Sequence, residues 1–116
     1  MARTQVNIMF RAFSDPTWLR ILHLLRDGEF CVGDLVTILR VPQPTASRHL
    51  AYLRKTGLVT TRKNGLWNFY KLSSPKSVFH RKLLDCLGDC FGSVPEMSRD
   101  TKGAAKLKRS GGCCPR

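Results

Sequence analysis

Five cysteines are the residues of this 116-residue chain best suited to bind a soft ion or to undergo redox chemistry. Cys86 and Cys90 stand four positions apart, so on one helix their sulfurs would point the same way and could hold a single soft ion. Burial in an apolar helix stripe explains the same pair equally well. The sequence leaves both interpretations open.

Two adjacent cysteines, Cys113 and Cys114, stand in a segment of Lys, Arg, Gly, Ser and Ala without an apolar pattern. Such a segment has no core for cysteines to fill, and exposed neighbouring thiols are reactive, so we favour a ligand role. Joined with the other pair, they would supply three or four thiolates and no hard oxygen, which suits As(III) or Cd(II). The predicted metal site is therefore Cys86, Cys90, Cys113 and Cys114.

Hydrophobic periodicity predicts four helices before residue 58. The first helix ends at residues 14–16, where Ser-Asp-Pro supplies a cap and a first-turn proline for the second. Gly28 closes the second helix, and Pro42 stops a short third helix. Pro44 lies in the first turn of the fourth helix, which Gly57 ends.

Residues 58–72 are rich in β-branched and aromatic side chains around Asn64-Gly65, which predicts a two-stranded hairpin that turns at this dipeptide. Ser74-Pro75 predicts the start of a fifth helix. Beyond Pro95 the helical periodicity is lost. We therefore predict one domain over residues 1–95 and a flexible, basic, cysteine-containing tail over residues 96–116.

The net charge of +12 and the isoelectric point of about 10.2 indicate a polyanionic partner. A solvated basic face would explain an isolated charge run equally well. Here the helix order, the hairpin and the basicity coincide, and together they favour nucleic acid. The predicted fold is mostly α with a small β-hairpin, a winged helix-turn-helix whose fourth helix enters the major groove of double-stranded DNA.

The start of the fourth helix carries side chains that can contact base edges or phosphates, and Arg48 is the strongest candidate among them. His49 could equally pack its ring against the core. Cations at the hairpin tip could reach a neighbouring groove or the DNA backbone. The predicted DNA-binding residues are Gln43, Thr45, Ser47, Arg48, His49, Arg62, Lys63 and Asn64.

Other classes of protein receive little support. The chain has no glycine-rich phosphate loop, no Cys-X-X-Cys and no acid/base constellation, so we predict that it is not an enzyme. A thiol redox or metal-transfer role for Cys113-Cys114 is the alternative from that class. No apolar stretch is long enough for a membrane span and no secretion signal begins the chain, which predicts a cytoplasmic protein without a membrane partner.

The chain resembles the ArsR/SmtB family of metal-responsive repressors in three segments: AFSDPTWLRIL at 12–22, PQPTASRHL at 42–50 and LRKTGLV at 53–59. The resemblance extends over about residues 5–91. It implies a homodimer built through the first and last helices, an operator with inverted-repeat symmetry, and repression relieved by an inducer. An apolar stripe on the fifth helix independently suits a dimer face, and it consists of Phe79, Leu83, Leu87 and Phe91.

In arsenite-responsive members of this family, the segment at the start of the third helix resembles Glu-Leu-Cys-Val-Cys-Asp-Leu, and its two thiolates bind the metalloid. Residues 29–35 read EFCVGDL, so Gly33 stands where the second cysteine would be. Cys31 alone is favoured as a small buried helix residue over a ligand. The last helix offers only His80 among histidines, so zinc sensing of the family's other type is not expected.

The sequence thus predicts a repressor that needs no cofactor to bind DNA and that As(III), or another soft metal ion, releases as inducer. A repressor of the same fold that senses oxidation or another non-metal signal is the alternative.

Overall fold

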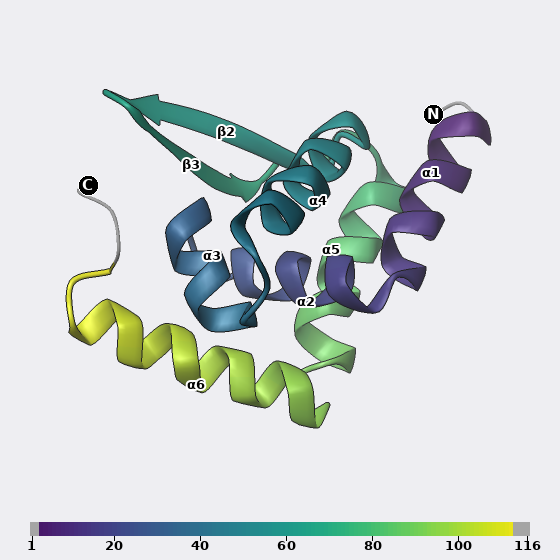
Figure 1. The fold of residues 1–116 in the computed structure, drawn as a ribbon. Helices are drawn as coiled ribbons and strands as arrows, with labels where there is room; N and C mark the ends of the chain where they lie inside the picture. The colour runs from purple at the N-terminus through teal and green to yellow at the C-terminus, as the bar shows by residue number, and fades with distance from the viewer. Residues whose placement is uncertain (1–2, 113–116) are drawn as a thin grey trace.

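The computed structural model describes residues 3–112, which form six helices and a small antiparallel sheet (Figure 1). The mostly helical, winged helix-turn-helix fold predicted from the sequence is confirmed. In chain order the elements are α1 (Arg3–Ser14), α2 (Pro16–Leu25), β1 (Phe30–Cys31), α3 (Val32–Leu39), α4 (Gln43–Lys55), β2 (Val59–Asn64), β3 (Trp67–Leu72), α5 (Val78–Cys90) and α6 (Pro95–Arg109).

The core is built around α2, whose residues from Ile21 to Leu25 are all buried. Asp15 fixes the start of this helix, because its carboxylate accepts hydrogen bonds from the backbone N–H groups of Thr17 and Trp18. Apolar residues of α3 and α4 pack in the same core as α2, and so does Leu87 of α5. The fully buried leucines include Leu35, Leu50, Leu53, Leu58 and Leu87.

The sheet has the strand order β1-β3-β2, and β2 and β3 form the long wing. Asn64 pairs with Trp67, so Gly65 and Leu66 form the turn, one residue later than the predicted Asn64-Gly65. Gly65 has a φ of 63°, which glycine adopts without steric cost. The two-residue strand β1 was not predicted, because a strand this short has no alternation to detect.

Helix α5 begins at Val78, later than the predicted Ser74-Pro75. The hydroxyl of Ser77 accepts a hydrogen bond from the backbone N–H of His80 and so caps the helix. Within residues 3–112, no helix combines the length and the apolarity that a membrane crossing requires.

The prediction of a flexible tail from residue 96 was wrong for residues up to Arg109, which belong to α6. Figure 1 shows α6 as a long helix below α2 and α3, on the side away from α4 and the wing. Its buried residues are Met97, Asp100 and Ala104. Because Asp100 is charged, this buried stripe does not show as an apolar periodicity in the sequence. The carboxylate of Asp100 accepts two hydrogen bonds of 2.8 Å from the guanidinium of Arg20, which holds α6 on α2.

Candidate nucleic-acid interface

Helices α3 and α4 are joined by a short turn that fixes the direction of α4. Arg40 adopts the left-handed conformation, with φ 58° and ψ 44°, and its backbone N–H donates to the carbonyl of Val36. Pro42 then precedes α4 in extended geometry, and Pro44 lies in the first turn. Because Ala46, Leu50 and Leu53 of α4 are buried, the opposite face of α4 points to solvent.

The exposed face of α4 carries four of the eight predicted DNA-binding residues. Gln43, Ser47 and Arg48 are exposed, and Thr45 is half-buried. Among residues 3–112, no carboxylate forms an ion pair with Arg48. The guanidinium of Arg48 is therefore available for a base edge or a phosphate, and its contact with DNA stays a prediction.

His49 has a different environment from its neighbours on α4. Its Nδ1 accepts a hydrogen bond of 2.6 Å from the indole Nε1–H of Trp18 on α2, and the two rings meet edge to face. The ring of Trp18 also contacts Tyr52, at 5.8 Å between centroids. These contacts match the core-packing alternative for His49, and they attach α4 to α2.

The wing contributes two different kinds of cation. The guanidinium of Arg62 contacts the carboxylate of Glu29 at 3.0 Å and stacks on the Phe69 ring at 4.8 Å. The hydrogen bond with Glu29 raises the pKa of Arg62 further above its ordinary value. Lys63 and Asn64 are exposed towards the tip, and no ion pair within the described part of the chain involves Lys63. Lys63 is the freer of the two cations.

Sequence reasoning missed two exposed residues near this surface. Arg40 lies in the turn between α3 and α4, and Trp67 is 43% exposed at the start of β3. An arginine directly before Val41-Pro42, after the last apolar residue of a helix, was the available signal for Arg40. Trp67 gave none, because aromatic residues are expected in any strand.

Cys31 is buried and caps α3, since its Sγ accepts from the backbone N–H of Asp34 at 3.4 Å. The Asp34 carboxylate accepts in return from the Cys31 N–H at 3.3 Å. Burial of Cys31 agrees with the sequence interpretation. Cys31 is also disulfide-bonded, which the sequence did not predict.

Cys86 and Cys90 are both free, and they are neighbours on α5. Cys86 is half-buried and Cys90 is exposed. A hydrogen bond with Cys90, together with burial, raises the pKa of Cys86, so the protonated thiol is favoured in the absence of a metal ion. Residues 3–112 contain no group of three or more His, Cys, Asp or Glu residues that could hold a metal ion. Cys113 and Cys114, the other half of the predicted site, lie outside the described residues.

Residues 15–61, from Asp15 into β2, match the family model described as bacterial regulatory protein, arsR family. The arsenical resistance operon repressor of Staphylococcus xylosus is 34% identical to this chain over 113 residues, which cover 97% of this chain and 100% of that protein. The chain belongs to the ArsR family. Its members are DNA-binding transcription regulators, in agreement with the predicted class.

Two further ArsR-family comparisons agree in sequence and in structure. The arsenical resistance operon repressor of Escherichia coli strain K12 is 45% identical over 78 residues, 66% of this chain and 67% of that protein. The structure of HlyU from Vibrio cholerae N16961 superposes with a TM-score of 0.65 at 35% identity, covering 75% of this chain and 94% of that one. The winged helix is therefore shared with solved regulators of similar sequence.

Proposed function

We propose that this ArsR-family protein is a transcriptional repressor that binds operator DNA through the exposed face of α4 and the β2–β3 wing. The observation that carries the proposal is Arg48, an exposed cation without an ion pair in the described chain, on a helix anchored by Trp18 and by buried leucines. Two relatives named as arsenical resistance operon repressors support repression.

The operator-bound form is a homodimer that uses α1 and α5. Phe10 of α1 is 55% exposed and packs edge to face on Phe79 of α5, at 5.1 Å between ring centroids. Val78, beside it, is 74% exposed. Large apolar side chains left open on two adjacent helices are suited to a self-complementary contact. A two-fold dimer would present two copies of α4 to an operator with inverted-repeat symmetry.

The inducer is As(III) or another soft ion held by cysteine thiolates. The sequence favours a set made of Cys86, Cys90, Cys113 and Cys114. Helix α6 has 15 residues and spans about 22 Å, with Cys90 near its first turn and Gly112 beyond its last. Within one chain, this length separates the α5 pair from Gly112, the last described residue.

Cys31 is the candidate third ligand beside Cys113-Cys114. A Cβ atom on Gly112 would lie 3.4 Å from the carboxylate of Asp34, three residues after Cys31. Lys108 reaches the same region, with its Nζ 4.9 Å from the Phe30 ring. The last described residue therefore lies beside the helix start that Cys31 caps, and Cys113-Cys114 follow it directly in sequence.

Release of DNA requires the inducer to bind the free form more tightly than the DNA-bound form. A metal bond to Cys31 would act at the first turn of α3, the helix that packs directly against α4. Phosphate contacts by Lys106, Lys108 and Arg109 would need a flexible tail, and we do not propose them because these residues belong to α6.

Fluorescence anisotropy on DNA from upstream of its own gene, with the protein reduced, tests both parts of the proposal. We expect salt-dependent binding that a few equivalents of arsenite reverse. Absence of binding contradicts the repressor, and binding that neither arsenite nor cadmium alters contradicts the metal inducer. A reporter repressed without inducer distinguishes this protein from an activator, the role named for HlyU of Vibrio cholerae.

Three serine variants assign the ligands: Cys86→Ser/Cys90→Ser, Cys31→Ser, and Cys113→Ser/Cys114→Ser. Serine is a good helix N-cap, so Cys31→Ser preserves the start of α3. Loss of response in the first and third variants supports the four-cysteine site from the sequence. Loss in the second and third supports a site that includes Cys31, and a full response in all three contradicts thiolate sensing.

Oxidation sensing is a second candidate, favoured by one observation: Cys31 is disulfide-bonded. Two thiols and one peroxide would give a disulfide and two waters, with the thiols as the two-electron reductant. Peptide mapping after treatment with peroxide identifies the partner of Cys31. DNA release by peroxide that Cys31→Ser abolishes would favour this signal over As(III), and release that Cys31→Ser leaves unchanged would contradict it.

A further inference from the structure

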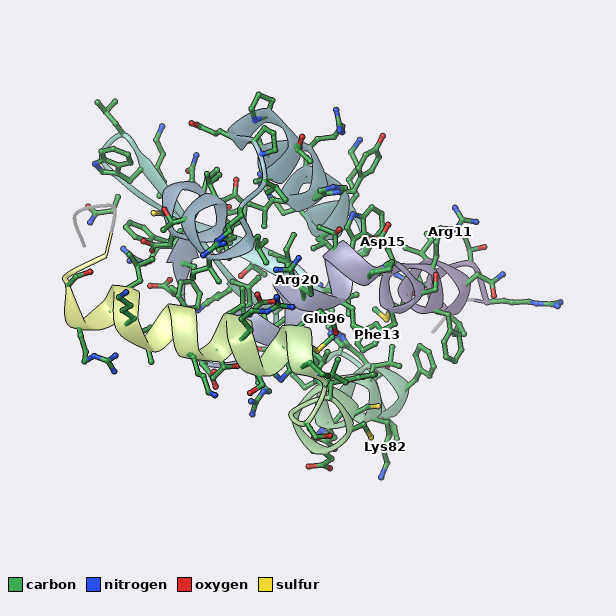
Figure 2. All side chains as sticks on the ribbon, turned by 60° about the horizontal axis from the view of Figure 1, so that its bottom comes forward. Arg11, Phe13, Asp15, Arg20, Lys82 and Glu96 are labelled. Atoms are coloured by element: carbon green, nitrogen blue, oxygen red, sulfur yellow. The ribbon has the colours of Figure 1, made fainter. Side chains whose placement is uncertain are left out.

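A cleft of about 600 Å³ lies between α6 and the helix-turn-helix, and no part of the proposed DNA or thiol chemistry uses it. One wall comes from α6 and the other from the end of α3 and its turn, with Arg20 of α2 between them. Figure 2 shows Arg20 directed towards α6, near Glu96 in its first turn. The volume lies in the range of small-molecule sites.

The charges around the cleft are almost all positive. Arg20, Arg40, Arg99 and Lys106 line it, and Asp100 is its single acidic residue. The carboxylate of Asp100 is 3% exposed and already neutralised by Arg20 at 2.8 Å. In the described part of the chain, Arg40, Arg99 and Lys106 form no ion pair, so these three cations are available to bind an anionic ligand.

The remaining lining is largely apolar. Ile38 and Leu39 supply it from α3, and Leu107 from α6, while Gly103 leaves that side of α6 without a side chain. A Cβ atom on Gly103 would lie 3.8 Å from Ile38, which is ordinary contact, so a side chain there would fill space along the wall. Cations beside apolar surface match a molecule with an anionic head and an apolar body.

We infer that this cleft binds a small amphipathic organic anion, a carboxylate, sulfonate or phosphate ester with an apolar body. The inference does not depend on the proposed operator or inducer. DNA is a less suitable occupant, because α6 lies on the side of α2 and α3 away from α4 and the wing (Figure 1). A ligand held by Arg40 and by α6 would join α6 to the turn that orients α4.

The probe is 8-anilinonaphthalene-1-sulfonate, whose fluorescence increases in apolar surroundings and whose sulfonate supplies the anionic head. We compare the full chain with Arg99→Glu/Lys106→Glu and with the control Lys102→Glu/Arg109→Glu, the same charge change at exposed α6 positions outside the cleft. We expect saturable binding by the wild type, at least tenfold weaker binding by the cleft variant and a change below twofold in the control. Equal weakening in both variants, or no saturable binding by the wild type, overturns the inference.

A second measurement uses only the wild-type protein and guards against a variant that fails to fold. In ¹H–¹⁵N correlation spectra, the probe should shift the amides of Ile38, Arg40 and Gly103 and leave those of α1 and α5 in place. Shifts confined to α1 and α5 would assign the probe to the exposed apolar face and contradict the cleft site. Displacement of the probe by duplex DNA would assign the cleft to phosphate contacts and would also contradict it.

Discussion

The indole of Trp18 donates a hydrogen bond of 2.6 Å to Nδ1 of His49, across 31 positions of sequence. This bond joins α2, the centre of the core, to the side of α4 that packs on it. His49 can accept it only while Nδ1 carries no proton, so Nε2 is the ring nitrogen that bears hydrogen in the neutral form. The orientation of α4 on the core thus depends on a polar contact in addition to its buried leucines.

Replacing Trp18 by Phe keeps an aromatic ring and removes the donor to His49. We expect a loss of about 1 kcal/mol in the free energy of unfolding, the usual value for one hydrogen bond, and a several-fold weaker DNA affinity because α4 is less firmly held. Urea denaturation and anisotropy measure the two effects. Tyr52→Phe, which keeps the ring packed on Trp18, is the control, and equal losses in both variants would refute a role for the hydrogen bond.

Asp100→Asn tests the ion pair that holds α6. The carboxylate is 3% exposed and Arg20 is 26% exposed, so we expect a loss of about 2 kcal/mol, below the value for a fully buried pair. Asp27→Asn is the matched control, because Asp27 and Arg26 are exposed and 3.8 Å apart, and it should cost less than about 0.5 kcal/mol. Similar chemical denaturation curves for the two variants would show that α6 is held by other contacts.

Two buried histidines should make the stability depend on pH. Burial lowers the pKa of His23 and of His80 below the ordinary value of 6.5, and Arg26 and Lys76 respectively lower it further. Neither nitrogen of His23 has a hydrogen-bond partner in the described structure, nor has Nε2 of His80. Both side chains are therefore buried in the neutral form.

A base whose pKa is lower in the folded state binds more protons when unfolded, so the free energy of unfolding rises with pH. This stabilisation is complete above the unfolded pKa of about 6.5 and is lost as the pH falls below it. We expect a lower urea midpoint at about pH 5.5 than at about pH 7.5, and a smaller difference in His23→Leu. An unchanged difference in that variant would show that His23 does not contribute.

The apolar face of α1 and α5 gives a test of the dimer. Phe10→Glu places a charge where we propose that two chains meet, so sedimentation should show a monomer, with DNA affinity reduced at least tenfold by loss of the second half-site. Leu66→Glu is the control, since Leu66 is 94% exposed at the wing tip, and it should remain dimeric. A wild-type protein that is already monomeric at micromolar concentration would contradict the dimer.

The sequence predicted the elements that have strong local signals. Asp15 and Pro16 identify the start of α2, and Pro42 and Pro44 identify the start of α4, because caps and prolines act within one turn. Helix α6 was missed because its buried stripe contains the charged Asp100, whose partner Arg20 lies 80 positions earlier in the sequence. Pairing over such a distance leaves no trace in local periodicity.

The sequence was enough to predict the residue types of the candidate site. It was less able to predict which of these side chains are free to contact DNA. Arg48 was expected to be exposed and is. Arg62 contacts Glu29 from 33 positions away, and His49 contacts Trp18 from 31 positions away. Only the fold reveals which cations and ring nitrogens are already occupied.

Anisotropy titration on DNA from upstream of its own gene, and on the same sequence shuffled, tests the central claim most directly. We expect the reduced wild-type protein to prefer the natural sequence, Arg48→Ala to lose at least tenfold in affinity for it, and Lys102→Ala on α6 to change it less than twofold. Equal binding to both DNAs, or equal effects of Arg48→Ala and Lys102→Ala, would contradict sequence-specific recognition through α4.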